Sequence, residues 1–127
     1  MLDAIAPPAG VRVLDRMAAS ARHIAGLQVT RWEQFDLPEK LPFQAMWYTV
    51  PPASSTYEDH HPETELSLVV SGTAVVEALG GVVAVPAGCS FLLPAGAPHV
   101  VHNRSASEPL VVFSAYWMPL GGQEGDR

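Results

Sequence analysis

Short apolar runs separated by glycine and proline turns dominate the sequence from residue 43 onward. The runs are rich in Val, Leu, Phe, Tyr and Thr, which suit a pleated and half-buried strand. Several strands of about 4–8 residues at near-regular spacing are typical of an antiparallel sandwich or barrel. We therefore predict strands over residues 27–32, 43–50, 56–61, 65–71, 73–79, 82–85, 90–93, 99–103 and 110–118.

The chain length of 127 residues suits a single domain whose core needs no disulfide bonds. Apolar residues between positions 15 and 25 recur at roughly helical spacing, and Gly26 follows as a stop signal. The interpretation is an N-terminal arm with a short helix over 1–26, a β-barrel over 27–118 and a loose tail over 119–127. The predicted fold class is all-β with one short N-terminal helix.

Acidic residues outnumber basic ones by 13 to 7, which gives a formal charge of −6. Such a surface repels phosphate backbones and anionic lipids, so we expect neither nucleic acid nor a membrane as partner. No cationic stretch precedes an apolar one at the N-terminus, and no apolar run reaches the ~18 residues of a membrane helix. Cys89, the one cysteine, is expected to be a small buried residue. The prediction is a soluble cytoplasmic protein.

Four side chains on two separate stretches can supply ligands to one metal ion. Asp59 and His61 alternate along a predicted strand and so share a face, and Glu65 follows at the start of the next run. His99 comes from a strand that is distant in sequence but can be adjacent in a rolled sheet. Two imidazoles and a carboxylate suit Fe(II), and a second carboxylate favours Fe(II) or Mn(II) over Cu or structural Zn. We expect a divalent ion of this kind, with Zn(II) and Ni(II) as open alternatives.

These residues resemble the pattern of the cupin superfamily, G-x5-H-x-H-x(3,4)-E-x6-G followed by G-x5-P-x-G-x2-H-x3-N, over roughly residues 43–118. Two positions depart from it: Ala53 stands at the first glycine and Asp59 at the first histidine. The matching residues are His61, Glu65 and Gly72 in the first half and Gly88, Pro94, Gly96, His99 and Asn103 in the second.

The resemblance implies a double-stranded β-helix, or jelly-roll barrel, with the metal inside its open end. His61, Glu65 and His99 are then the ligands, and Asp59 fills the fourth place. Three roles remain open for Asp59. It can bind the metal, or it can orient a metal-bound water or a ligand histidine without touching the metal itself. It can also be a solvated carboxylate at a strand end with no part in the site. Asn103 and the glycines are expected to serve turns and hydrogen bonds rather than chemistry.

Two other histidines compete for places in this pattern. His60 also satisfies the looser spacing to Glu65, if a bulge turns it inward, and Glu58 would then occupy the first ligand position. We prefer His61, which leaves His60 facing outward. His102 lies three positions after His99, so on a regular strand the two side chains lie on opposite faces, and His102 is predicted to point away from the metal.

The resulting hypothesis is a metal-dependent enzyme acting on a small organic molecule inside the barrel. The chemistry is oxygenase-type, or isomerase, cyclase or lyase chemistry with Asp59 as the catalytic proton acceptor. The alternative is a non-catalytic cupin module that binds a small ligand or metal as a sensor or carrier. We also expect a homodimer, because long strands such as 43–50 can leave open edges that a second copy covers.

Overall fold

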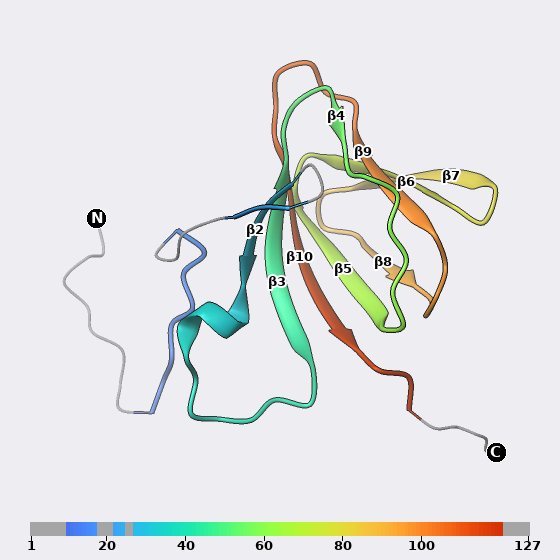
Figure 1. Cartoon of the computed structure of the whole chain (residues 1–127). Coiled ribbons are helices and arrows are strands. Elements are labelled where there is room, and N and C mark those ends of the chain that lie inside the picture. Colours follow the sequence, from blue (N-terminus) through green and yellow to red (C-terminus); the bar gives the residue numbers. More distant parts are fainter. Residues whose placement is uncertain (1–9, 18–21, 25–26, 121–127) are drawn as a thin grey trace.

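The computed structural model describes residues 10–17, 22–24 and 27–120, and its regular secondary structure consists almost entirely of antiparallel strands in two sheets (Figure 1). The all-β fold class is confirmed. A larger sheet has the order β1 (Arg22–Ile24), β2 (Leu27–Arg31), β3 (Gln44–Val50), β10 (Leu110–Trp117), β5 (Thr64–Ser71), β8 (Ser90–Leu93). A smaller sheet has the order β4 (Ser54–Ser55), β9 (His99–Asn103), β6 (Thr73–Ala78), β7 (Gly81–Pro86). One 3-10 turn, η1 (Trp32–Phe35), follows β2.

Alternation along the strands divides each sheet into an inner and an outer face. In β5, Glu65, Ser67 and Val69 are buried whereas the residues between them are exposed. Because side chains alternate across a strand, the buried three face the space between the sheets. Both sheets contribute to the core, whose members are Val29, Tyr48, Val50, Val69, Ala74, Val76, Val85, Leu93, Val101, Leu110 and Val112.

An aromatic cluster covers part of the outer face of the larger sheet. Trp47 of β3 and Phe113 of β10 lie opposite each other, with ring centroids 5.5 Å apart. Trp32 of η1 packs against both, at 6.1 Å from Trp47 and 5.5 Å from Phe113, and Phe35 and Phe43 join them. This packing holds the connection between β2 and β3 against the sheet.

Asn103 ties together the loops at one end of the barrel. Its side-chain amide donates to the carbonyl oxygens of Val50, Pro51 and Glu108, at 2.8–3.1 Å, and its Oδ1 accepts from the Ser105 backbone N–H. The structural role expected for Asn103 is confirmed.

Gly72, between β5 and β6, has φ +88°, and a Cβ there would lie 3.0 Å from the Pro109 carbonyl oxygen. The tight turn between β5 and β6 therefore requires glycine at this position.

The helix expected over residues 15–25 is not confirmed. Arg22–Ile24 form β1 and pair with Leu27–Val29 in a hairpin, and residues 18–21 and 25–26 lie outside the described residues. A helix of this length is only marginally stable unless it packs an apolar face. Pairing with β2 satisfies the backbone hydrogen bonds of residues 22–24 and is therefore favoured over the helix. No helix among the residues that the structure describes is long and apolar enough to cross a membrane.

Three further expectations are wrong. Residues 56–61 do not form a continuous strand: Asp59 pairs with His99 in an isolated bridge, and the Thr56 N–H donates to the Val101 carbonyl. β3 is not an edge strand, because β2 and β10 flank it. Cys89 is exposed rather than buried, since it lies in the turn before β8, where its N–H donates to the Pro86 carbonyl.

Candidate metal centre

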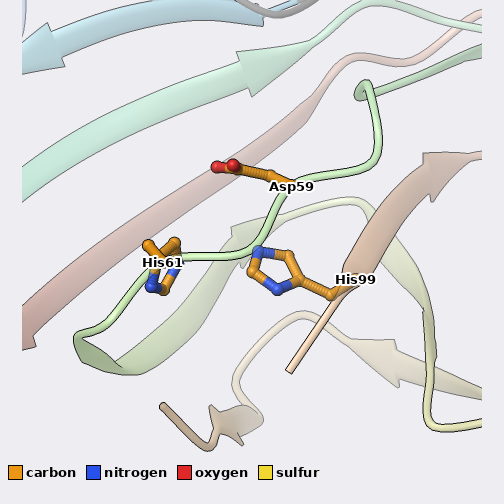
Figure 2. A group of neighbouring side chains, drawn as sticks. All are labelled: Asp59, His61 and His99. Atoms are coloured by element: carbon orange, nitrogen blue, oxygen red, sulfur yellow. The ribbon is translucent and has the colours of Figure 1, made fainter. Parts of the chain in front are cut away.

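Three of the four predicted ligands converge at the opening between the sheets. Asp59, His61 and His99 each offer one ligand atom, and these atoms all lie within 4.8 Å of one another. Asp59 and His61 lie on the same connecting segment, and the His99 ring extends toward that segment from the start of β9 (Figure 2). Paired backbone hydrogen bonds, at 2.9 and 3.0 Å, join Asp59 to His99 and fix the two residues in register. This bridge brings residues 40 positions apart to one point.

Backbone carbonyls set the tautomer of both imidazoles. His61 Nδ1 lies 3.0 Å from the Glu63 carbonyl oxygen, and His99 Nδ1 lies 2.9 Å from that of Ala97. A carbonyl only accepts, so Nδ1 carries the proton in each ring. In the neutral ring Nε2 then presents its lone pair, which is the arrangement of metal-binding histidines.

Glu65 contacts the group through His61. Its Oε1 lies 3.0 Å from His61 Nε2, its Oε2 accepts from the Ser67 hydroxyl at 3.2 Å, and the side chain is 7% exposed. With the proton on Nδ1, Nε2 and the carboxylate are both acceptors. They attract each other only through a shared cation, either a second proton on the ring or a metal ion.

The donor set therefore fits a divalent ion. Two neighbouring ligands at about 2.1 Å from one ion are themselves about 3.0 Å apart when they subtend a right angle. The observed separation of 3.0 Å between His61 Nε2 and Glu65 Oε1 matches this value. Glu65 does not belong to the 4.8 Å group, and its direct contact with that group is the one to His61.

The competing residues lie elsewhere. His60 and Glu58 are exposed, outside the convergent group. His102 is turned toward other partners: its Nδ1 lies 2.6 Å from the Ser55 hydroxyl and its Nε2 2.9 Å from Glu77 Oε1. The alternation predicted for His99 and His102 is confirmed.

A small cavity of about 60 Å³ adjoins the site between the two sheets. Burial, together with a smaller effect of the Glu65 carboxylate, raises the pKa of the Tyr48 hydroxyl that faces it. Tyr48 lies two residues after Met46 on β3, so both side chains face the inside of the barrel. The cavity is lined by Leu27, Met46, Tyr48, Thr56, Tyr57, Asp59, Glu65, Leu93, His99 and Val101.

The Cupin_2 family model, which describes a cupin domain, matches residues 46–116. The chain belongs to this cupin family. The matched segment runs from β3 to β10 and contains all four candidate ligands. The fold and the family that the residue pattern indicated are confirmed.

Solved structures with the same fold support this assignment. A Cupin 2 conserved barrel domain protein from Salinispora arenicola is 27% identical, with 87% of this chain and 90% of that chain covered and a TM-score of 0.70. The plu4264 protein from Photorhabdus luminescens is 25% identical over 85% of this chain and 87% of that chain, with a TM-score of 0.70. The polyketide cyclase RemF from Streptomyces resistomycificus is 15% identical over 84% and 78%, with a TM-score of 0.71, and shares the fold alone.

Proposed function

We propose that this cupin is a metal-dependent enzyme that acts on a small organic molecule inside the barrel. One observation carries the proposal: His61 and His99, each with Nδ1 held by a backbone carbonyl, converge with the Asp59 carboxylate, and Asp59 and His99 line a cavity. His99 is buried, His61 is half-buried and Asp59 is exposed, so the group lies at the edge of the core, where an ion or a small molecule can reach it.

In the proposal His61, His99 and Glu65 hold the ion, and Asp59 is either a fourth ligand or the catalytic base. Fe(II) or Mn(II) suits two imidazoles with one or two carboxylates, and Zn(II) or Ni(II) are alternatives. When bound, the ion supplies a Lewis acid for a substrate oxygen or a coordination position for O2. The buried Ser67 hydroxyl, 2.8 Å from the Ser114 hydroxyl, holds Glu65 in orientation from behind.

Asp59 suits the role of proton acceptor. Its carboxylate lines the cavity, and within the described part of the chain no hydrogen bond occupies it. A carboxylate placed beside a polarised carbonyl can remove a proton from the adjacent carbon. This favours isomerisation, cyclisation or elimination, whereas an ion with an open position for O2 favours oxygenase-type chemistry. The polyketide cyclase has the same fold, so this fold is compatible with cyclase chemistry, but the likeness does not decide between the two classes of reaction.

The experiment is a metal titration followed by turnover. Metal-free protein is titrated with Fe(II), Mn(II), Zn(II) and Ni(II) by calorimetry, with His102→Ala as control for His99→Ala. One ion per chain, lost in His99→Ala and retained in His102→Ala, supports the centre. Oxygen uptake and NMR with candidate substrates then separate the enzyme from a sensor or carrier, which would bind without turnover.

We further propose that two copies pair through the outer face of the larger sheet. An apolar outer patch, composed of Leu66, Leu68, Val70 and Leu92, is exposed on the adjacent strands β5 and β8. Leu66 and Leu92 lie directly opposite each other, so the patch is continuous across the two strands. Contiguous exposed apolar surface of this kind marks interaction sites. In this proposal two copies pair through the apolar outer patch, rather than through the open edge of a strand as expected from the sequence.

A further inference from the structure

A second group of polar side chains lies on the outer face of the smaller sheet. Ser55 of β4, His102 of β9 and Glu77 of β6 come from three neighbouring strands of that sheet (Figure 1). Ser55 pairs directly with His102, and Glu77 lies diagonally across from it on β6. Val101 is buried, so the next residue, His102, faces outward, whereas His99 faces the inside of the barrel. The group is therefore separate from the candidate metal centre.

The two hydrogen bonds of the His102 ring have a defined direction. Its Nε2 lies 2.9 Å from Glu77 Oε1, and its Nδ1 lies 2.6 Å from the Ser55 hydroxyl oxygen. Because a carboxylate only accepts, Nε2 carries the proton, and in the neutral ring Nδ1 is then an acceptor. The Ser55 hydroxyl therefore donates its proton to Nδ1, and the lone pairs of its oxygen stay free.

This is the proton arrangement of an activated serine. In a Ser-His-Asp site one ring nitrogen accepts the serine proton, and a carboxylate holds the N–H of the other. The two ring nitrogens of His102 are exchanged relative to that arrangement, but each performs one of the same two tasks. Both distances lie within the range of about 2.6–3.2 Å that joins a nucleophile, its base and the orienting group. Ser55 is exposed, so a molecule from solution can reach its oxygen.

The neighbouring Ser54 lacks this arrangement. Its hydroxyl donates to the Pro52 carbonyl oxygen at 3.0 Å, which is a local bond within the turn before β4. A carbonyl cannot take up the hydroxyl proton as a base, so Ser54 keeps the low reactivity of an ordinary serine. The chain thus places an activated and an ordinary serine side by side.

We propose that Ser55 is a nucleophile that accepts the acyl group of small neutral esters, with His102 as its general base. In the first step the Ser55 oxygen bonds to the acyl carbon, and the bond from that carbon to the leaving oxygen breaks. The serine proton passes through Nδ1 of His102 to the leaving alcohol or phenol. In the second step water attacks the same carbon, its proton passes through His102 to the Ser55 oxygen, and a carboxylic acid leaves. Glu77 is a positioning residue, which keeps the ring N–H on Nε2 and stabilises the imidazolium.

The surroundings restrict the substrate and the rate. The Glu77 carboxylate repels anionic acyl donors, which favours neutral esters. Because Ser55 is exposed, water solvates the oxyanion that forms. We therefore expect a slower reaction than in enzymes with an oxyanion hole, where a single donor contributes about 10²–10³-fold. Phenyl esters, whose leaving group departs readily, are the best substrates expected.

The test is the labelling of the full-length protein by diisopropyl fluorophosphate. This probe bonds through phosphorus to an activated serine oxygen and releases fluoride together with the serine proton, and fragment-ion mass spectrometry assigns the labelled residue. Ser55 should react at least about 100-fold faster than Ser54, which is the lower part of the contribution of a general base. Hydrolysis of p-nitrophenyl acetate should fall in proportion to the labelled fraction of Ser55. Equal rates at the two serines, or hydrolysis that is unchanged after complete labelling, would overturn the proposal.

Variants test the roles of the two partners, and thermal unfolding is followed for each. His102→Ala should slow the labelling of Ser55 by about 100-fold, whereas the matched control Ser54→Ala should change it by less than about twofold. Glu77→Ala should slow it as well, and added formate, which can occupy the place of the lost carboxylate, should restore part of the rate. Unchanged labelling in His102→Ala refutes the base, and absence of rescue by formate refutes the role of Glu77. If His102→Ala fails to fold, the comparison of Ser55 with Ser54 in the parent protein decides.

Discussion

Replacing Ala53 by glycine should stabilise the protein, although the change removes a side-chain carbon. Ala53 has φ +52°, in the left-handed region, where a Cβ crowds the following carbonyl oxygen. Its N–H donates to the Ser105 carbonyl at 2.7 Å and β4 begins at the next residue, so the backbone cannot relax into another region. The residue is exposed, and its methyl group contributes little packing.

The magnitude follows from two opposing quantities. Relief of the left-handed conformation is worth about 1–2 kcal/mol. The added flexibility of glycine in the unfolded chain costs about 0.5–1 kcal/mol. The net gain therefore lies between about 0 and 1.5 kcal/mol. The middle of this range, about 0.7 kcal/mol, corresponds to a rise in melting temperature of about 2–4 °C for a domain of this size.

Urea denaturation and calorimetry of the metal-free protein measure this gain. The matched control is Ala45→Gly, since Ala45 is fully buried in β3 and is not among the residues with positive φ. The control should lose about 1 kcal/mol or more through added chain entropy and lost burial. If Ala53→Gly is destabilised as much as Ala45→Gly, the strain assigned to Ala53 does not exist.

The remaining predictions concern the site, the turn at Gly72 and the interface. His99→Ala should weaken metal binding by more than about 100-fold, because losing a residue that only orients a ligand already costs about 10–100-fold. His102→Ala should weaken it by less than about threefold, and equal losses in calorimetry would refute the assignment. Asp59→Asn should fold normally and either lower metal affinity by about 10–100-fold or abolish turnover, and a fully active, fully metallated variant would make Asp59 a solvated bystander. Gly72→Ala should cost about 1–3 kcal/mol in urea denaturation, because it combines a positive φ with a 3.0 Å approach to a carbonyl; unchanged stability would contradict the close contact. Leu68→Glu should convert a dimer into a monomer in sedimentation, and a parent protein that is monomeric at all concentrations would remove the proposed interface.

Some features of the site could be predicted from the rule that side chains alternate across a strand. Glu65 was assigned by its place in the cupin pattern instead, because alternation of polarity alone would turn Leu66 and Leu68 inward, and both are exposed. His99 and His102 were separated by the rule of alternation, and hydrogen bonds of the two rings to different partners confirm it. The spacing of glycines and prolines likewise marked the turns, since glycine tolerates positive φ and proline fixes φ near the value that many turns need.

Features that depend on contacts between distant segments were not predictable. β10 inserts between β3 and β5, so β3 became an interior strand, although nothing in its own residues indicates its neighbours. The expected helix near residue 22 was replaced by a hairpin, because pairing with β2 outweighs a weak helical periodicity. The carbonyls that fix the imidazole tautomers belong to Glu63 and Ala97, and side-chain type does not specify where a backbone carbonyl points.

The most direct test is a crystal structure of the Fe(II)- or Mn(II)-loaded protein with anomalous data collected at the metal edge. We predict one strong anomalous peak per chain, within about 2.1–2.2 Å of Nε2 of His61 and His99 and of a Glu65 carboxylate oxygen. A peak at another place, or none while His61 Nε2 remains bonded to Glu65 alone, would contradict the central claim that these side chains share one ion.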